Sequence, residues 1–530
     1  MSDVAHLEFA SGTYDIKDAV ARDEITKITY PSVPSMKNDA SITTGQFIAT
    51  QGYYSAGDFG AGTYLTTQEK PDSGWYEELD NGIFAVLLQT KVNFKSCGGI
   101  ADGTTDQSDL FNTILNERGI RNVFIPKGKY LFNKTVNVPK WTKICGEGVT
   151  GAYEHSYKNS TYIKCNLQTG ALFNISNTTP FNGSNNSFNY STVHIHDLCI
   201  DSDVQAACAI YFGGYNITIE RVQILHFTCG IYADYAYCSY VKQVKIMYTY
   251  KPFTCRHTLT TLEVSDCYFG GVDTVTSNSQ IDNTYIVANA HYTQLYHTGF
   301  DLLPSSGVTI KNTPAEKYVY GVSVEELCSV VSDGLWLEAI TTALFNFNTS
   351  TNISTIVAKS FRCWNSGESP YNAAVLANMK YFDRLVIDTT PINGDFEGYT
   401  HISIPKSGYS YCQPSLIVNG QAEWYLPITL GNGTLARNKS TFIHDILNLS
   451  FRATGVTASS FTIGWLGQYA QNSAAIVPCG YLVKSGSYIP LVCDTSTWTV
   501  TRADGSAFAM ASGDNIYFHL IINMNNRYNI

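Results

Sequence analysis

The chain carries little charge for its length. Asp, Glu, Lys and Arg make up 15% of its 530 residues, whereas they make up roughly a quarter of an ordinary soluble domain. The net charge is -10 at pH 7, and no basic block interrupts the sequence. Nucleic acid and an anionic membrane surface are therefore not expected as partners. An acidic polysaccharide is compatible with this composition, because local Lys and Arg side chains can still line a groove.

Leader, membrane and metal signals are also lacking. The N-terminal residues MSDVAHLEFASG have no basic start followed by an apolar run, and no stretch reaches the roughly 18 apolar residues of a membrane span. The 14 cysteines are scattered, without a CxxC pair or histidines at metal-ligand spacing. We expect no metal and no cofactor. Cys199, Cys267 and Cys363 lie in apolar, strand-like runs, which predicts free, buried thiols in a chain folded in a reducing cytosol.

What the chain does have favours β structure. Glycine (41) and tyrosine (36) are abundant, and aromatic and β-branched side chains suit a pleated surface. Residues 1–30 carry alternating charge and the weakly helical run DIKDAVARDEI, so we expect an anchor or a flexible segment there. Residues 31–90 are β-rich and punctuated by glycine, which predicts a small domain ahead of the main fold.

One amphipathic helix is expected over 106–118. Asp106 is a plausible N-cap and Gly119 a plausible stop. The apolar face of this helix consists of Leu110, Phe111, Ile114 and Leu115. Two strands separated by the turn PKG follow directly, which places the helix at the entrance to a β-rich region.

Between about 190 and 410 a ragged repeat of 20–25 residues appears, in which each unit is a short alternating strand bounded by polar turns. Its segments are VHIHDLCID, ITIERVQIL, SYVKQVKIM, TLEVSDCYFGG, VVSDGLWLEAI, TIVAKSFRCWN and YFDRLVIDT, with an inward apolar column of Leu198, Val222, Val244 and Leu335. A single coil cannot bury its own apolar face, so the repeat predicts stacked coils. The 106–118 helix would cover the open first coil. After about 413 the strands lengthen and the period is lost, which favours a β-sandwich of jelly-roll type.

The run 92–148 resembles the entry to the pectate-lyase-like right-handed β-helix of bacteriophage tailspikes and capsule depolymerases. The segments that carry the resemblance are GGIADGTTD, VFIPKGKYLF, TKICGEG, the upstream GYYSAGDFGAGTY and the later GLWLE. The resemblance implies an all-β homotrimer attached to a virion through its N-terminus. Its parts would be an anchor (1–30), a pre-helix domain (31–90), a right-handed parallel β-helix with a capping helix (91–412), and a β-sandwich for trimerisation or carbohydrate contact (413–530).

The repeat phase suggests where a sugar would bind. If Leu335 points inward, then Trp336 and its equivalents Cys199, Gln223, Lys245 and Tyr268 point outward in one column. Aromatic ring faces stack on the C–H faces of sugars, so Trp336 and Tyr268 are the best candidates for substrate contact. A contact between subunits of a trimer is an equally good interpretation of both.

Hydrolysis of a glycosidic bond needs two carboxyl groups across the sugar. Glu338, Asp333 and Glu326 are the catalytic candidates, because they flank Trp336 or end the preceding segment. Neighbouring coils lie about 4.8 Å apart, which brings such acids within reach of one another. Glu263 and Asp266 form a second acidic group beside Tyr268. For each acid taken alone, a solvated turn is the simpler explanation.

Two alternatives stay open. β-Elimination would need a base such as Tyr292 or His297, in NAHYTQLYHTGFD, and a cation such as Arg221 or Lys245 to neutralise a uronate. The other alternative is a receptor-binding fibre without catalytic activity. We favour an endo-acting hydrolase of a capsular or O-antigen polysaccharide, made in the host cytoplasm and acting from the virion at the cell surface.

Overall fold

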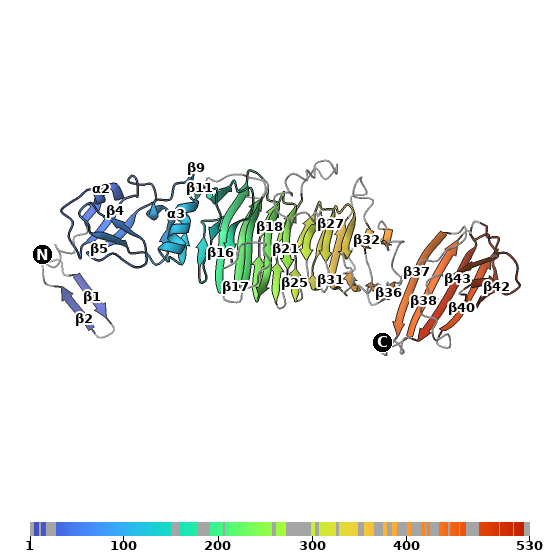
Figure 1. Ribbon diagram of the computed structural model, residues 1–530. Helices are drawn as coiled ribbons and strands as arrows, with labels where there is room; N and C mark the ends of the chain where they lie inside the picture. Colours follow the sequence, from blue (N-terminus) through green and yellow to red (C-terminus); the bar gives the residue numbers. More distant parts are fainter. Residues whose placement is uncertain are drawn as a thin grey trace. The chain divides into compact units, whose positions relative to one another are not determined.

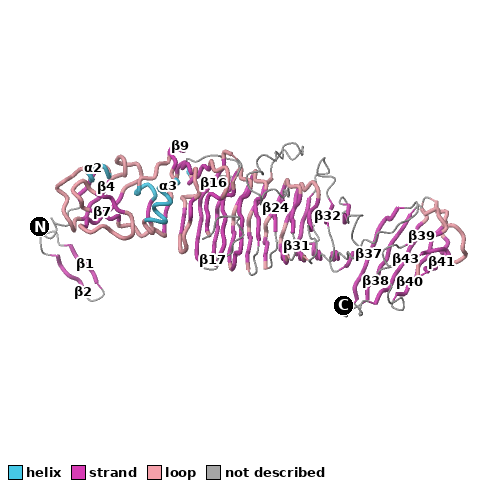
Figure 2. Tube along the Cα trace, in the orientation of Figure 1, coloured by secondary structure: helices cyan, strands magenta, loops and turns pink. Residues whose placement is uncertain are grey.

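The computed structural model consists of two compact units, Met1–Leu295 and Tyr296–Ile530, and strands dominate both of them (Figure 2). The described residues are 5–9, 12–16, 28–149, 159–176, 191–204, 207–256, 261–271, 298–302, 307–324, 328–347, 354–364, 375–378, 384–389, 400–403, 415–418, 421–423, 434–443, 446–454, 456–462, 476–494, 496–497, 499–511 and 513–523. None of the helices in these ranges has the length and apolar character needed to cross a membrane.

The first unit begins with two small β structures. Strands β1 (Ala5–Phe9) and β2 (Gly12–Ile16) pair antiparallel. The helical pattern expected around DIKDAVARDEI falls mostly on residues 17–27, outside the described residues, and its first two residues belong to β2. A five-stranded sheet of order β3-β4-β5-β7-β6 follows; four of its strands lie in the β-rich segment expected over 31–90, and β3 precedes that segment. Its elements are β3 (Ile28–Tyr30), α2 (Val33–Lys37), β4 (Phe47–Thr50), β5 (Gly62–Thr67), β6 (Tyr76–Glu78) and β7 (Phe84–Leu87).

The predicted capping helix is confirmed, in a shorter form. An α-helix, α3 (Ser108–Asn112), continues into a π-helical turn, Thr113–Glu117, and Gly119 follows in the left-handed conformation with φ +66°. The N-cap is Gln107, whose side chain makes no capping hydrogen bond, so the prediction of Asp106 as N-cap is wrong by one residue. Asp106 still contacts the start of the helix, because its Oδ1 accepts hydrogen bonds from the backbone N–H of Ser108 at 3.0 Å and from the Ser108 hydroxyl at 2.6 Å.

The helix closes the core of the first coil. Phe111 packs edge-on against Phe94 and Phe132, with ring centroids 5.1 and 5.6 Å apart. Asn112 Oδ1 accepts from the backbone N–H of Asn137 at 3.0 Å, and Asn112 Nδ2 donates to the carbonyl of Thr135 at 2.9 Å. The helix therefore covers apolar side chains and also satisfies backbone groups at the edge of the coil.

The rest of the first unit is a parallel β-helix whose coils form three sheets (Figure 1). The first sheet holds β8 (Val92–Asn93), β10 (Asn122–Phe124), β13 (Lys143–Cys145), the start of β16 (Ser191–Ser202), the middle of β17 (Cys208–Leu225), β19 (Ser239–Lys242) and β22 (Leu262–Ser265). The second holds β9 (Asp102–Asp106), β11 (Gly128–Phe132), β14 (Thr161–Cys165), the ends of β16 and β17, β20 (Lys245–Met247) and β23 (Tyr268–Gly270). The third holds β12 (Val136–Asn137), β15 (Ala171–Ile175), the start of β17, β18 (Cys229–Tyr237) and β21 (Lys251–Arg256).

Apolar columns run through the interior of these coils. One side chain per strand points inward at the same register position, and all of these side chains are buried: Val123, Ile144, Ile195, Ile219, Val241 and Val264 in the first sheet, Ile163, Ile200, Ile224, Ile246 and Phe269 in the second, and Phe173, Ile210, Ile231 and Phe253 in the third. Burial of such a side chain contributes roughly 1.5–3 kcal/mol. The inward positions predicted for Leu198, Val222 and Val244 are confirmed, since all three are buried.

A single left-handed residue turns each coil from the first sheet to the second. Asp197, Arg221, Gln243 and Asp266 occupy this corner in successive coils, with φ between +49° and +60°. Non-glycine residues seldom adopt this conformation, so the stacked coils impose it on four different side chains. The corner directs three charged side chains and one amide outward, between the two sheets.

The second unit continues with parallel strands and then changes pairing. Its parallel strands are β24 (Thr298–Leu302), β25 (Val308–Lys311), β26 (Pro314–Glu316), β27 (Tyr320–Val324), β28 (Ser329–Asp333), β29 (Trp336–Glu338), β30 (Ala343–Phe347), β31 (Thr355–Trp364), β32 (Val375–Asn378), β33 (Arg384–Thr389), β34 (Thr400–Ser403) and β35 (Ser415–Val418). Strands β25 and β28 precede a corner, like the strands of the first sheet in the first unit. Strands β26 and β29 follow the corner, like the strands of the second sheet. Residues 307–324 therefore form one coil of this unit with β25, β26 and β27.

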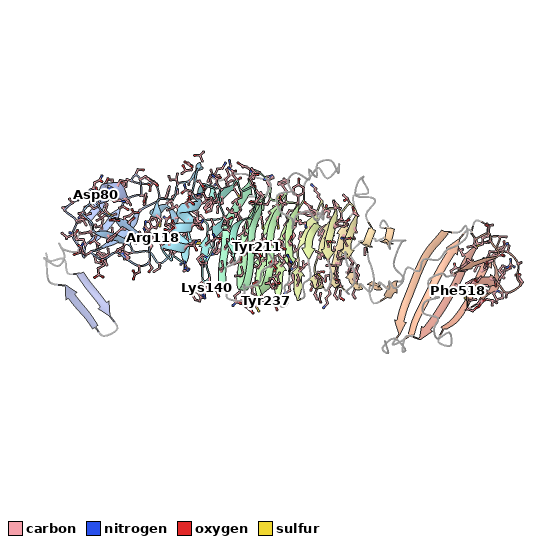
Figure 3. The ribbon with its side chains drawn as sticks, viewed as in Figure 1. Asp80, Arg118, Lys140, Tyr211, Tyr237 and Phe518 are labelled. Carbon is pink, nitrogen blue, oxygen red and sulfur yellow. The ribbon has the colours of Figure 1, made fainter. Side chains whose placement is uncertain are left out.

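The C-terminal strands pair antiparallel. They are β36 (Gln421–Glu423), β37 (Thr434–Ile443), β38 (Ile446–Thr454), β39 (Ser460–Thr462), β40 (Ile476–Lys484), β41 (Ser487–Asp494), β42 (Thr499–Arg502) and β43 (Asn515–Asn523). Phe518, labelled in Figure 3, is buried, and a Cβ on the opposite Gly480 would come within 2.3 Å of its ring. The loss of the coil period after about 413 is thus explained, whereas the sandwich, the trimer and the four domain boundaries stay predictions.

The predicted free thiols are confirmed for the described part of the chain. Twelve cysteines are free there, and most of them, including Cys199 and Cys267, are buried. Cys363 is only partly buried, and Cys238 is exposed. No group of three or more His, Cys, Asp and Glu side chains within the described residues could hold a metal ion.

Candidate functional site

The second unit brings two glutamates and a tryptophan onto one outer wall. Strands β26 and β29 pair in register, with Pro314 opposite Trp336 and Glu316 opposite Glu338. Ala315 and Leu337, between them, are buried, so the flanking side chains point outward. Trp336 is 41% exposed, an unusual state for so large an apolar ring. The wall therefore offers an aromatic face beside two carboxyl groups on adjacent coils.

The electrostatic environment of Glu338 suits an acid. Partial burial raises the pKa of its carboxyl group, the nearby Glu316 raises it further, and Lys317 opposes the shift. A carboxyl group with a raised pKa keeps its proton at a higher pH, which is the property that a general acid needs.

Asp333 lies on the preceding strand, across a tight corner. Gly334 forms that corner with φ +73°, and a Cβ there would come within 2.5 Å of the Asn312 side chain, so the turn requires glycine. Asp333 is exposed and stands in register between Lys311 and Lys359 of the neighbouring coils. Opposite charges at such cross-strand positions stabilise the pairing of the strands. The predicted inward position of Leu335 is confirmed, because its side chain is buried.

The predicted outward column of the first unit is in register but is not open to solvent throughout. Cys199 pairs with Gln223, Gln223 with Lys245, and Lys245 with Tyr268. Cys199 and Gln223 are nevertheless buried, because an apolar cluster forms on this outer face. Lys245 and Tyr268 are partly exposed, and the ammonium group lies 5.2 Å from the ring centroid.

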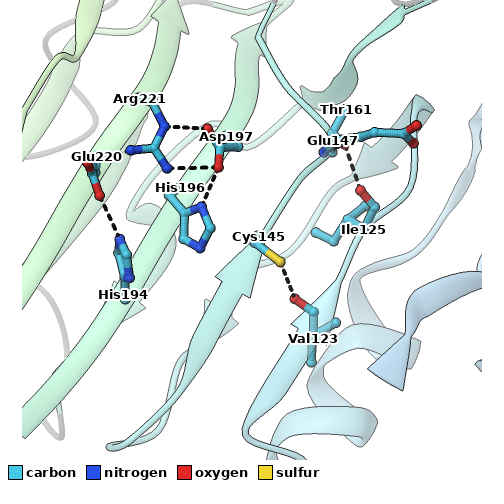
Figure 4. A network of polar contacts seen from close by, with 10 residues as sticks. All are labelled: Val123, Ile125, Cys145, Glu147, Thr161, His194, His196, Asp197, Glu220 and Arg221. Carbon is cyan, nitrogen blue, oxygen red and sulfur yellow. Dashed lines mark hydrogen bonds and ion pairs between the residues drawn. The ribbon is translucent and has the colours of Figure 1, made fainter. Parts of the chain in front are cut away.

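Arg221 belongs to a polar network at the corner of the first unit (Figure 4). Its Nε donates to Asp197 Oδ1 at 2.6 Å, and another guanidinium nitrogen donates to Asp197 Oδ2 at 3.0 Å. The hydrogen bonds from Arg221 hold the pKa of Asp197 down at about 2. His196 Nδ1 lies 2.5 Å from the same carboxylate, and His194 contacts Glu220 at 3.2 Å. The charge of Arg221 is thus engaged by carboxylates of this chain.

The remaining candidates are dispersed. Glu263 lies in β22 opposite Tyr240, whereas Asp266 is an exposed residue at the corner after β22, so the two do not share one strand. Glu326, Tyr292 and His297 lie outside the described residues. Among the described candidates, the structure therefore brings together Trp336 and Glu338 in the second unit, and Lys245 and Tyr268 in the first.

A family model for rhamnogalacturonase A/epimerase, pectate lyase-like, matches residues 91–323. The β-helix of this chain is of the pectate-lyase-like type. No curated protein sequence matches the chain.

Solved structures similar to this chain include phage tailspikes. One is a tailspike from Acinetobacter baumannii bacteriophage Fri1, a capsular polysaccharide depolymerase, at 10% identity and TM-score 0.43, covering 95% of this chain and 99% of that one. Another is the tailspike of Acinetobacter phage vB_ApiP_P1, at 12% identity and TM-score 0.46, covering 94% and 99%. Pantoea stewartii WceF, a glycan biofilm modifying enzyme, has 12% identity and TM-score 0.43, covering 98% and 73%. At such TM-scores these similarities carry no inference about the activity of this chain.

Sequence reasoning missed Glu316, although a signal for it exists. VTIKNTPAE and VVSDGLWLE align along the pectate-lyase-like helix with their final glutamates at the same offset, as the register confirms. Pro314 makes the similarity of the two segments hard to recognise, because a proline argues against a strand at that position.

The missed residues of the first unit surround Asp201. Tyr162 Oη donates to Asp201 Oδ2, and His226 Nδ1 lies 2.8 Å from Asp201 Oδ1. Burial and the hydrogen bond to Asp201 raise the pKa of Tyr162. Asp201 ends one repeat segment and His226 directly follows the next, but Tyr162 precedes the recognised repeat, so the three could not be grouped from sequence.

Proposed function

We propose that this chain is a tailspike-type depolymerase that hydrolyses glycosidic bonds within a bacterial capsular or O-antigen polysaccharide. The observation that carries the proposal is the outward pair Glu316 and Glu338 beside the exposed ring of Trp336, with the pKa of Glu338 raised. A raised carboxyl pKa next to an aromatic platform on an open wall suits protonation of a glycosidic oxygen.

Each residue of the wall has a separate role in this mechanism. Trp336 stacks on the C–H face of a sugar and orients the scissile bond. Glu338 donates its proton to the leaving oxygen as the glycosidic bond breaks, and the water that then adds to the anomeric carbon returns a proton to Glu338. Asp333, which stands in register between Lys311 and Lys359, stabilises the positive charge that develops on the sugar ring. Glu316 acts on Glu338, because its charge helps to keep the Glu338 carboxyl group protonated.

The biological setting of the proposal follows the resemblance of residues 92–148. The chain would assemble as a homotrimer in the host cytoplasm, attach to the virion tail through its N-terminal segment and act at the bacterial surface. Residues 413–530 would serve trimerisation or carbohydrate contact. Bacterial polysaccharide and further copies of this chain are the partners, and the reaction as proposed uses no cofactor.

The test compares amide variants on purified polysaccharides. Glu338→Gln, Asp333→Asn and Glu326→Gln are assayed for release of reducing ends against a panel of capsules, with Glu78→Gln, an exposed strand residue, as the control. We expect Glu338→Gln to lower the rate by roughly a hundredfold or more while the folded assembly survives. Full activity in all three variants overturns the assignment of the site.

Product analysis separates the alternatives. Hydrolysis leaves a saturated product, whereas β-elimination leaves an unsaturated uronate that absorbs in the ultraviolet, and that absorbance would replace the hydrolase proposal by a lyase. Binding of a capsule with no change in its viscosity or size would indicate a receptor-binding fibre. Light scattering of the purified chain tests the trimer, and a stable monomer would contradict it.

A further inference from the structure

The outer face of the second sheet in the first unit is unusually apolar. Tyr162, Cys199, Leu225 and Met247 form a buried cluster there. Their sequence neighbours Ile200, Ile224 and Ile246 point into the helix and are also buried. The sheet is therefore covered on both sides, and the outer cluster is a second, smaller core on a wall that otherwise faces outward.

Aromatic rings border this cluster. Tyr248 and Tyr268, both partly exposed, pack against it. The ring of His226 stacks on Tyr248 with centroids 5.0 Å apart and an interplanar angle of 8°. His226 and Tyr248 both have positive φ, +58° and +53°, which bulky residues rarely adopt. The stacked coils thus hold two flat rings at neighbouring corners, next to the tyrosine of the adjacent strand.

Charged groups stand among the rings. The Asp201 carboxylate accepts from Tyr162 and contacts His226, and its side chain is only 9% exposed. Lys129 Nζ lies 5.7 Å from the ring centroid of Tyr162, and Lys245 Nζ lies 5.2 Å from that of Tyr268. Lys129 pairs in register with Tyr162, and Lys245 pairs with Tyr268. One fixed carboxylate and two ammonium groups therefore share a single face with the tyrosines.

We propose that this outer aromatic surface, comprising Tyr162, Asp201, His226, Lys245, Tyr248 and Tyr268, binds a sugar residue that bears a carboxylate. The rings of Tyr248 and Tyr268 take the C–H face of the sugar, and His226, which the buried Asp201 holds in place, takes a hydroxyl group. Lys245, with Lys129 on the same face, pairs with the carboxylate through a charge-assisted hydrogen bond. The inference rests on the proposed function for its glycan, and it narrows the substrate to an acidic polysaccharide.

The experiment measures binding in the full chain carrying Glu338→Gln, so that the polymer stays intact. The probes are purified uronate-containing capsular polysaccharides, each beside its carboxyl-reduced form, and the readout is affinity electrophoresis. We expect at least one acidic polymer to bind and its reduced form to bind about tenfold more weakly. Lys245→Met should weaken binding of the acidic form about fivefold to tenfold, and Lys245→Arg should restore most of it.

The chain offers a matched control. Lys140, labelled in Figure 3, lies over the exposed ring of Trp141 at 4.6 Å, in the same unit but outside the surface. Like Lys245→Met, Lys140→Met removes an ammonium group that lies over an aromatic ring. Because this group is outside the proposed surface, binding of the acidic polymer should not change. Equal losses in Lys140→Met and Lys245→Met would overturn the proposal, as would equal binding of acidic and reduced polymers or no binding to any of them.

The two proposals fail in distinguishable ways. If the chain without substitutions cleaves no polysaccharide but Lys245→Met still weakens binding, hydrolysis is wrong and the acidic-sugar surface stands. If cleavage occurs and Lys245→Met binds normally, the surface is wrong and hydrolysis stands. Thermal unfolding of each variant shows whether a loss of binding comes from misfolding, and Lys245→Arg provides the folded comparison.

Discussion

The outer walls of the two units differ, although their inner columns obey the same rule. In the first unit, outward-facing Cys199, Leu225 and Met247 are buried beneath tyrosines. In the second unit, outward-facing Val331 and Trp336 are 39% and 41% exposed. The backbone pairing is parallel and in register in both. The same coil geometry therefore supports a covered wall in one place and an open wall in another.

This difference shows which residues carry information on function. Inward positions such as Ile224 and Leu337 are apolar and buried in either unit, since only such side chains fill the interior of the coil. The outward residue at the next position is not constrained in this way. The residues that determine function are therefore expected at the outward positions, which alternate with core positions along each strand. Substitutions at neighbouring inward and outward positions can test this difference.

The largest effect is expected from a charge placed in the covered wall. Leu225→Asp buries a carboxylate in the outer cluster and should cost about 3 kcal/mol or more, or prevent folding. Val331→Asp places the same charge at an exposed outward position and should change stability by less than about 1 kcal/mol. Thermal denaturation followed by circular dichroism measures both, and equal losses would mean that the two walls do not differ in packing.

Two adjacent residues of the second unit, the inward Leu335 and the outward Trp336, allow core and surface positions to be compared directly. Leu335→Ala should lower the free energy of unfolding by about 2–5 kcal/mol, because it leaves a cavity in the core. Trp336→Ala, one residue later, should cost far less stability but should abolish most of the cleavage by removing the sugar platform. Unfolding curves and reducing-end assays on both variants provide the check. A Trp336→Ala chain that is unstable yet fully active per folded molecule would contradict this separation.

Much of the architecture could be predicted because it depends on local patterns. The alternation around Leu198, Val222 and Val244 identified the coils, and Asp106 with Gly119 located the helix to within a few residues. Each of these signals lies within one strand or one turn. The fold of a solenoid is easier to predict from sequence than most folds, because every coil repeats the same short pattern of apolar and polar residues.

The candidate site was less accessible from sequence, because its grouping depends on register between coils. Glu316 and Glu338 are 22 residues apart, and only the pairing of β26 with β29 makes them neighbours. Burial on the outer face was also hidden: Cys199 and Gln223 occupy outward positions, but side chains from other strands cover them. Periodicity gives the direction of a side chain and does not say what lies over it.

A smaller, pH-dependent effect is expected at the corner network of Figure 4. Hydrogen bonds from Arg221 lower the pKa of Asp197 to about 2, below the value near 3.9 of an unfolded aspartate. The pair therefore stabilises the fold fully above pH 4 to 5, and this contribution is lost as the pH falls toward 2. Asp197→Asn should cost roughly 1–2 kcal/mol at pH 7 and almost nothing near pH 2.

The matched control for this network is Asp109→Asn. Asp109 pairs with Lys134 at 2.5 Å, but both side chains are more than half exposed, so solvent screens the pair and its loss should cost little at any pH. Melting temperatures from pH 2 to 7 compare the two variants. A constant difference between Asp197→Asn and the unsubstituted chain across that range would contradict the role given to ionised Asp197.

The smallest expected effect concerns the open wall, where Glu316 acts through Glu338. Replacement of Glu316 by Gln removes a negative charge that raises the pKa of Glu338, so that pKa should fall. A general acid works only while protonated, so the high-pH limb of the activity profile should move to lower pH. Cleavage rates between pH 4 and 9, normalised to each variant's maximum, measure the shift, and Glu78→Gln should leave the profile in place. An unchanged limb in Glu316→Gln would mean that the acid of the reaction lies elsewhere on the wall.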